Sequence, residues 1–205
     1  ENLNIALECD EALHLLSGDK EQRIQGLRVF CEYRDKRSFP LLLPLLDQPC
    51  PVERMSAVYA LGRNPCPKAV QKLVSLLETD DNAYVRRATA WSLANYDNQI
   101  VLKPLINALK NDVAAVRLWS SSSLAEIGGI SSANAQTAAE QLLISLKIDN
   151  ESGVRSNCIW SLCRLYEKLN NTFQESFVDE CTKIALFDKE PSVMEEAKTA
   201  LDSMG

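Results

Sequence analysis

Apolar and small residues along this chain recur at a helical spacing. After Val85 they follow at three, four, seven and eight positions, at Ala88, Thr89, Ser92 and Leu93. At about 100° per residue, these positions share one face of a helix. The same spacing returns several times along the chain, and it predicts an amphipathic helix in each copy.

This helical pattern is part of a sequence repeat. The segment DDNAYVRRATAWSL (Asp80–Leu93) returns as NDVAAVRLWSSSSL (Asn111–Leu124) and DNESGVRSNCIWSL (Asp149–Leu162), with fainter copies at Val52–Leu61 and Asp188–Leu201. We take the residue before the arginine of each copy, or the equivalent position, as its reference residue. Consecutive reference residues lie 31 to 39 positions apart, and they are Gln22, Glu53, Val85, Val116, Val154 and Val193. This period is typical of stacked helix pairs.

A leucine-rich segment precedes each copy and is expected to form the partner helix. These segments are Leu3–Leu16, Phe39–Leu46, Lys68–Leu77, Ile100–Leu109, Asn134–Leu146 and Phe173–Leu186. We therefore expect an all-α fold, a right-handed solenoid of six helix pairs that forms a single domain over residues 1–205. The last two intervals are the longest, so they should hold longer helices or loops. Gly62 and the pair Gly128–Gly129 are expected to end helices as C-terminal caps.

Composition narrows the class of protein. A hydrophobic content of 46% can supply a continuous core, and a net charge of −6 argues against a nucleic-acid-binding protein. No apolar run approaches the roughly 18 residues of a membrane span. The N-terminal residues lack the basic start of a signal peptide, so we expect a cytoplasmic protein.

The seven cysteines form no CxxC pair, and the chain has one histidine, so the usual Cys/His zinc spacings cannot be formed. We expect no metal site and interpret the cysteines as small apolar residues in a reducing compartment, with Cys158 in a buried position. Iron–sulfur binding or a reactive thiol stays open as an alternative.

The residues that repeat resemble a known family. The pattern D-x-x-x-x-V-R-x-x-A-x-x-x-L after a leucine-rich helix resembles the HEAT repeat, and more specifically the short HEAT-like repeat of phycobilin lyases and related cyanobacterial proteins. The first copy departs from the pattern at Gln22, and Met194 replaces the arginine in the last copy. The resemblance implies that the V-R helices line a concave inner face. It also implies a structural ladder of Asp and Arg side chains between adjacent repeats: Asp81, Arg86, Asp112, Arg117 and Arg155.

A set of aromatic residues is the leading candidate for a binding site. Tyr59, Trp91 and Trp160 each lie six positions after the reference residue of their copy, and Trp119 lies three positions after its own. Such a row offers contact area for an apolar peptide or a flat tetrapyrrole. The alternative is packing between adjacent repeats. Arg87 lies beside the row, at the arginine position least committed to the ladder, and we expect it to contact a ligand.

No catalytic constellation is evident. His14 lies in an apolar helix without a patterned nucleophile, and the chain lacks phosphate-loop, nucleophile-elbow and zinc-protease motifs. We therefore expect a non-catalytic scaffold, a monomer or member of a hetero-complex, that binds another protein through its concave face. The resemblance implies an antenna or assembly component of photosynthesis as the partner. The alternative that it implies is a phycobilin lyase or lyase subunit, with a bilin (an open-chain tetrapyrrole) as cofactor.

Overall fold

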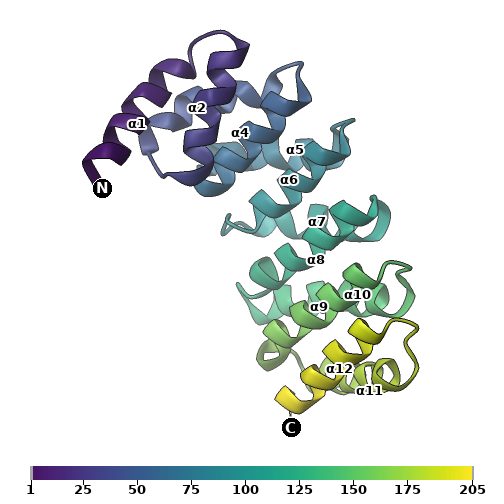
Figure 1. Ribbon diagram of the computed structural model, residues 1–205. Helices are drawn as coiled ribbons and strands as arrows, with labels where there is room; N and C mark the ends of the chain where they lie inside the picture. The colour runs from purple at the N-terminus through teal and green to yellow at the C-terminus, as the bar shows by residue number, and fades with distance from the viewer. Residues whose placement is uncertain (1, 205) are drawn as a thin grey trace. The chain divides into compact units, whose positions relative to one another are not determined.

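The computed structural model describes residues 2–204, and every regular element in that range is helical (Figure 1). The all-α prediction is confirmed. The chain divides into two compact units, Glu1–Tyr96 and Asp97–Gly205. Each unit holds three helix pairs of the repeat, in which a first helix is followed by the second helix that carries the V-R pattern.

In unit 1 the three first helices differ, because the N-terminal one is continuous, the middle one is interrupted and the last one is short. Prolines interrupt the middle one, since Pro40 lies at the start of α3 and Pro44 at the start of the 3-10 helix η2. The first helices are α1 (Asn2–Leu15), α3 (Phe39–Leu42) continued by η2 (Leu43–Asp47), and α5 (Val70–Thr79), with 3-10 turns η1 (Lys36–Ser38) and η3 (Pro67–Ala69). The second helices are α2 (Lys20–Glu32), α4 (Pro51–Arg63) and α6 (Ala83–Leu93).

In unit 2 every α-helix except α7 has 14 residues or more. The first helices are α7 (Leu102–Asn111), α9 (Ser132–Ile148) and α11 (Asn171–Phe187), with 3-10 turns η4 (Gln99–Val101) and η5 (Tyr166–Lys168). The second helices are α8 (Ala114–Gly128), α10 (Ser152–Leu165) and α12 (Pro191–Met204). The two 17-residue helices α9 and α11 account for the long intervals in the sequence repeat.

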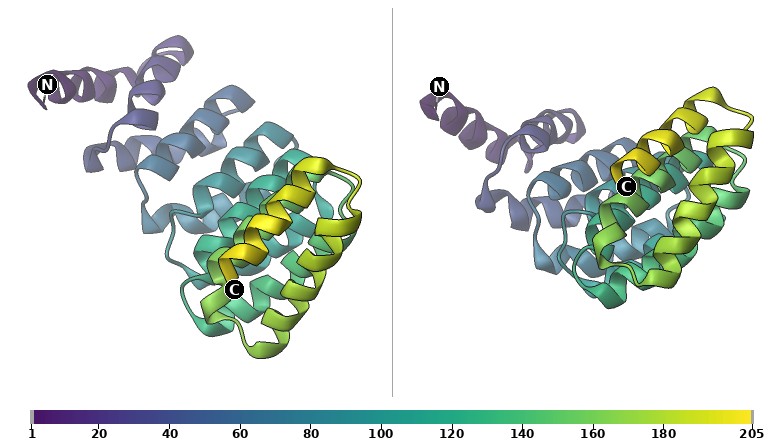
Figure 2. Two further views of the ribbon diagram at one scale, coloured as in Figure 1. Left: turned by 60° about the horizontal axis from the view of Figure 1, so that its bottom comes forward. Right: turned by 90° about the horizontal axis from the view of Figure 1, so that it is seen from below.

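Within each unit the second helices pack side by side. In unit 1, α4 lies between α2 and α6, and in unit 2, α10 lies between α8 and α12 (Figures 1 and 2). The reference valines of the repeat face the core, because Val85, Val116, Val154 and Val193 are at most 1% exposed. Cys158 is also fully buried, as predicted. The helical register read from the sequence is therefore confirmed in these four copies, whereas Gln22, the reference residue of the first copy, is exposed.

The glycine prediction is confirmed in part: α8 ends at Gly128 with Gly129 as its C-cap residue, but Gly62 ends no helix. Gly62 lies inside α4, which continues to Arg63, and no described glycine has a positive φ. A Cβ added at Gly62 would lie 2.5 Å from Cζ3 of Trp91 on α6. A Cβ added at Gly128, the last residue of α8, would lie 3.1 Å from the two Cδ atoms of Leu165. These glycines are needed for their small size at a helix–helix contact, not for a left-handed cap.

Candidate functional site

The best-defined polar feature is a set of ion pairs between consecutive repeats. Nε and Nη2 of Arg54 donate to the two carboxylate oxygens of Asp80 over 2.8 and 2.9 Å. The same bidentate pair joins Arg117 to Asp149, at 2.7 and 2.8 Å. In each pair the arginine of one second helix reaches the acidic loop of the following repeat. The pairs therefore tie neighbouring helix pairs together.

Both partners of each pair are anchored further. Arg117 Nη1 donates to the Asp112 carbonyl, at the start of its own helix, and the Asp149 carboxylate accepts the Glu151 N–H. Arg155 repeats the arrangement with Asp188, at 2.9 and 2.7 Å, and this pair is almost completely buried. These bonds link α8 to the loop before α10, and α10 to the loop before α12.

The structure changes one residue of the expected ladder. Asp81 is exposed, and its neighbour Asp80 pairs with Arg54 instead. Arg86 Nη1 donates to the Asp80 carbonyl over 2.7 Å, and the Asp112 carboxylate accepts the Val113 N–H over 2.7 Å. The sequence offered two adjacent aspartates. Only the first can both face the preceding arginine and accept the N–H of Asn82, two residues on.

Hydrogen bonding sets the ionisation of these aspartates. Burial alone would raise the pKa of Asp149. The hydrogen bonds from Arg117 and from the Glu151 N–H outweigh burial, so this pKa lies below the ordinary value of 3.8. The pKa of Asp80 and that of Asp188 are lowered by the same balance.

The two members of the predicted aromatic row that lie in unit 1 pack against each other. The rings of Tyr59 on α4 and Trp91 on α6 lie 5.3 Å apart at an angle of 55°. Both side chains are half-buried, and Trp91 also packs on Gly62. This pair fills the contact between α4 and α6, as the packing alternative expected.

The two tryptophans of unit 2 are different because they are exposed. Trp119 on α8 is 36% exposed and Trp160 on α10 is 40% exposed. The guanidinium of Arg164 lies 5.0 Å from the centre of the Trp160 ring. Both rings are therefore more exposed than those of Tyr59 and Trp91.

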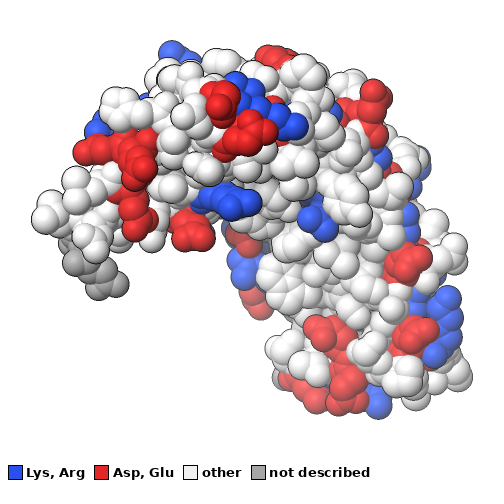
Figure 3. Space-filling view, turned by 45° about the horizontal axis from the view of Figure 1, so that its top comes forward, with Lys and Arg blue, Asp and Glu red and all other residues white. Residues whose placement is uncertain are grey.

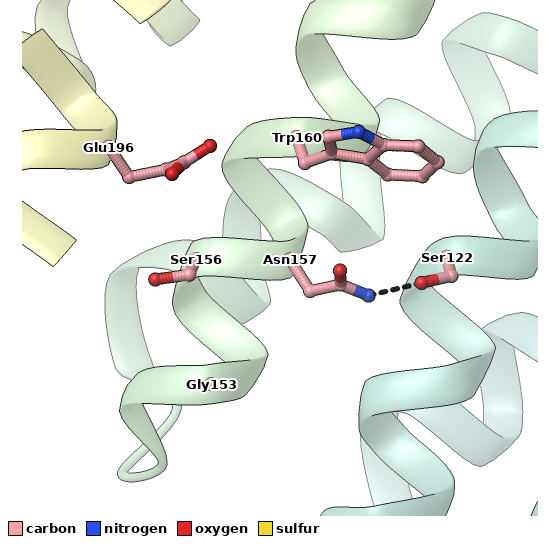
Figure 4. A pocket seen from close by; sticks show the side chains of 6 residues that line it. All are labelled: Ser122, Gly153, Ser156, Asn157, Trp160 and Glu196. Carbon is pink, nitrogen blue, oxygen red and sulfur yellow. Dashed lines mark hydrogen bonds between the residues drawn. The ribbon is translucent and has the colours of Figure 1, made fainter. Parts of the chain in front are cut away.

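A hollow of about 260 Å³ lies beside Trp160. It is lined by residues of α8, α10 and α12, namely Ser122, Gly153, Ser156, Asn157, Trp160 and Glu196. Figure 4 shows Trp160 and Asn157 projecting toward α8, Ser156 pointing away from α8, and Glu196 reaching from α12 toward α10.

The polar groups of the hollow fall into two classes. Asn157 Nδ2 already donates to the Leu118 carbonyl over 2.8 Å and to Ser121 Oγ over 2.9 Å, and it also bonds Ser122 Oγ (Figure 4). Asn157 therefore fixes α10 against α8. Among the described residues, by contrast, none forms an ion pair or hydrogen bond with the Glu196 side chain. Burial, and then the charge of Glu196, raise the pKa of the Cys163 thiol.

Sequence reasoning missed Ser122, Asn157 and Glu196. The signal was available, because Ser122 is six positions after its reference residue, like Trp160, and Asn157 and Glu196 are three positions after theirs, like Trp119. These positions face the same side of the second helices. The three residues were not predicted, because the candidate row was defined by aromatic side chains and these residues are polar.

Charge and metal-binding capacity set limits on the chemistry. Figure 3 shows Lys and Arg side chains interspersed with Asp and Glu side chains on one face. Within residues 2–204, no group of three or more His, Cys, Asp and Glu side chains is arranged to hold a metal ion. His14 is exposed near the end of α1. No helix of the described range is both long and apolar enough to cross a bilayer.

Comparison with known proteins decides the family. The family model for HEAT repeats matches residues 10–94 and 70–163, which together cover most of the chain. The chain belongs to the HEAT-repeat family. The comparison with curated proteins finds no match.

Solved structures share the fold of this HEAT-repeat protein at low sequence identity. A designed armadillo repeat protein in complex with the peptide (KR)4 is 19% identical with a TM-score of 0.71, and the alignment covers 96% of this chain and 99% of that one. Another designed armadillo repeat protein is 18% identical, with a TM-score of 0.67 and coverage of 96% and 100%. Yeast importin-beta (Kap95p) is 13% identical with a TM-score of 0.66, and the match covers 96% of this chain but 29% of importin-beta.

Proposed function

We propose that this HEAT-repeat protein is a non-catalytic scaffold that binds a segment of a partner protein on the exposed side of α8, α10 and α12. We call this side the unit 2 face. The exposure of Trp119 and Trp160 carries the proposal. Aromatic residues are enriched among the residues that dominate binding energy at protein interfaces, and Trp is prominent among them.

The polar hollow beside Trp160 supports the same function. Ser156 and the Glu196 carboxylate supply hydrogen-bonding groups next to an aromatic ring. The helices that carry them are fixed by the Asn157 and Arg155 hydrogen bonds, so little conformational entropy is lost when a segment docks. A designed protein of the same fold forms a complex with a peptide, which supports a peptide segment as the ligand.

Selection from a display library of random peptides tests the proposal. We expect peptides that bind the wild-type protein to bind the double variant Trp119→Ala, Trp160→Ala at least about tenfold more weakly, because a dominant interface residue contributes about 2 kcal/mol or more. The matched control is Phe187→Ala, which removes an 80% exposed aromatic ring at the end of α11. Equal binding by all three proteins would contradict the proposal.

Two finer points rest on the resemblance of the sequence to phycobilin-lyase repeats. On that basis we propose that the partner is an antenna or pigment-assembly protein. Titration with a free open-chain tetrapyrrole tests the lyase alternative. A saturable red-shifted absorbance that the Trp119→Ala, Trp160→Ala variant loses would favour bilin delivery, and an unchanged spectrum would favour the scaffold.

A further inference from the structure

A second hollow lies in unit 1, between the N-terminal ends of α4 and α6. It encloses about 180 Å³. Pro51, Val52 and Met55 line it from α4, and Asn82, Tyr84 and Arg87 line it from the start of α6. Val52 is 49% exposed and Tyr84 is 65% exposed, so apolar surface borders the hollow on both sides.

Arg87 differs from the arginines that tie the repeats together. Arg54, on the neighbouring helix, has a carboxylate partner in Asp80. Among the described residues no carboxylate pairs with Arg87. Its guanidinium carbon lies 5.5 Å from the centre of the Tyr84 ring, and Nη2 donates to the Tyr59 hydroxyl over 3.3 Å. Its Nε is buried and has no hydrogen-bond acceptor. The guanidinium is therefore held in place by two tyrosines while its charge is unmatched.

Asn82 supplies a second donor to the same hollow. Its Oδ1 accepts the N–H groups of Tyr84 and Val85 and so caps α6. This capping role orients the amide and leaves Nδ2 without a partner among the described residues. A guanidinium and an amide N–H at the edge of an apolar hollow are complementary to a carboxylate that is attached next to an apolar group.

We propose that this hollow binds a partner segment in which an Asp or Glu lies next to an apolar side chain. The apolar side chain enters between Val52, Met55 and Tyr84, and the carboxylate is bound by Arg87 and Asn82. The proposal goes beyond the proposed function, because it assigns a second binding site, in unit 1, and names the chemistry of the segment that this site takes. Charge complementarity selects an acidic segment, since a basic one would meet the unmatched charge of Arg87.

Peptides selected on the wild-type protein test this site. In the tightest peptide, each Asp and Glu is changed in turn to Asn and Gln. We expect one of these changes to weaken binding to the wild-type protein about tenfold. The same change should weaken binding to Arg87→Ala less than twofold, because that variant has no guanidinium with which the peptide carboxylate can pair. Asn82→Asp keeps the helix cap but replaces the amide donor with a negative charge, and it should weaken the unmodified peptide as much as Arg87→Ala does.

The matched control is Arg28→Ala. Arg28 is exposed on α2 of the same unit, so its loss lowers the net charge equally without touching the hollow. If Arg28→Ala and Arg87→Ala weaken binding equally, the effect comes from net charge alone and the proposed site is wrong. If peptides need Trp119 and Trp160 but no acidic position couples to Arg87, this site is wrong while the proposed function stands. If they need Arg87 but neither tryptophan, the unit 2 face is wrong and this site stands.

Discussion

At the scale of single residues, the contact between α4 and α6 depends on a glycine. Gly62 leaves room for the edge of the Trp91 ring, which also packs on Tyr59. The interface is therefore a close fit of a large side chain against bare backbone. Such contacts tolerate added volume poorly, because a packed interior has few voids.

Gly62→Ala should destabilise unit 1. Overpacking costs about 1–3 kcal/mol, and the preference of a helix for Ala over Gly offsets up to about 1 kcal/mol. We expect the free energy of unfolding, measured with urea, to fall by about 1–2 kcal/mol. Gly153→Ala is the control, because an added Cβ there meets the flexible end of Leu118. Two variants of equal stability would show that the Trp91 contact imposes no constraint.

At the scale of helices, paired arginines and aspartates connect one repeat to the next. The Arg155–Asp188 pair ties α10 to the loop before α12, and both side chains are less than 10% exposed. Arg164 and Glu126 form a pair of similar length on α10 and α8, but both are about half exposed. The difference in burial determines what each pair contributes.

Arg155→Met should be far more damaging than Arg164→Met. Removing Arg155 leaves a buried carboxylate without its partner, which costs about 3–5 kcal/mol. An exposed pair contributes about 0–1 kcal/mol. Calorimetric melting of both variants checks this, and adding Asp188→Asn to Arg155→Met should recover part of the lost stability. Equal melting temperatures for Arg155→Met and Arg164→Met would contradict this difference between the buried and the exposed pair.

The ladder also predicts how stability depends on pH. Asp80, Asp149 and Asp188 have pKa values below that of an ordinary aspartate, so the folded state binds protons less readily than the unfolded state does. Their stabilisation is therefore complete above the ordinary pKa of about 3.9 and is lost as pH falls through the lowered values. We expect urea midpoints to drop below about pH 4. Asp149→Asn should lower the midpoint at pH 7 and flatten this acid dependence.

The sequence predicted helices and their register better than it predicted contacts between them. Periodicity identified the buried valines and Cys158, because a buried face repeats every turn of a helix. It did not distinguish Asp80 from Asp81, since that choice depends on where the preceding arginine reaches. It also grouped four aromatic residues that differ in burial, because exposure depends on the neighbouring helix. The hollow lined by Ser122, Asn157 and Glu196 was not predicted, because it depends on how α8, α10 and α12 pack together.

At the scale of the whole molecule, each unit presents a distinct surface suited to a partner. Unit 2 offers two open tryptophans beside a hollow with a carboxylate, and unit 1 offers an unmatched guanidinium beside an apolar hollow. Both lie on second helices, which the repeat holds rigid through the buried valines and the ion-pair ladder. The repeated residues thus stabilise the fold, and we propose that residues that vary between repeats bind the partner.

Fluorine NMR of the protein labelled with 5-fluorotryptophan tests the central claim most directly. The chain has three tryptophans, so each gives one resolvable signal. On saturation with a peptide selected on wild type, we predict large shifts for Trp119 and Trp160, because a docked segment covers them, and a much smaller shift for the packed Trp91. A saturated complex in which the Trp119 and Trp160 signals stay where they were would contradict the account.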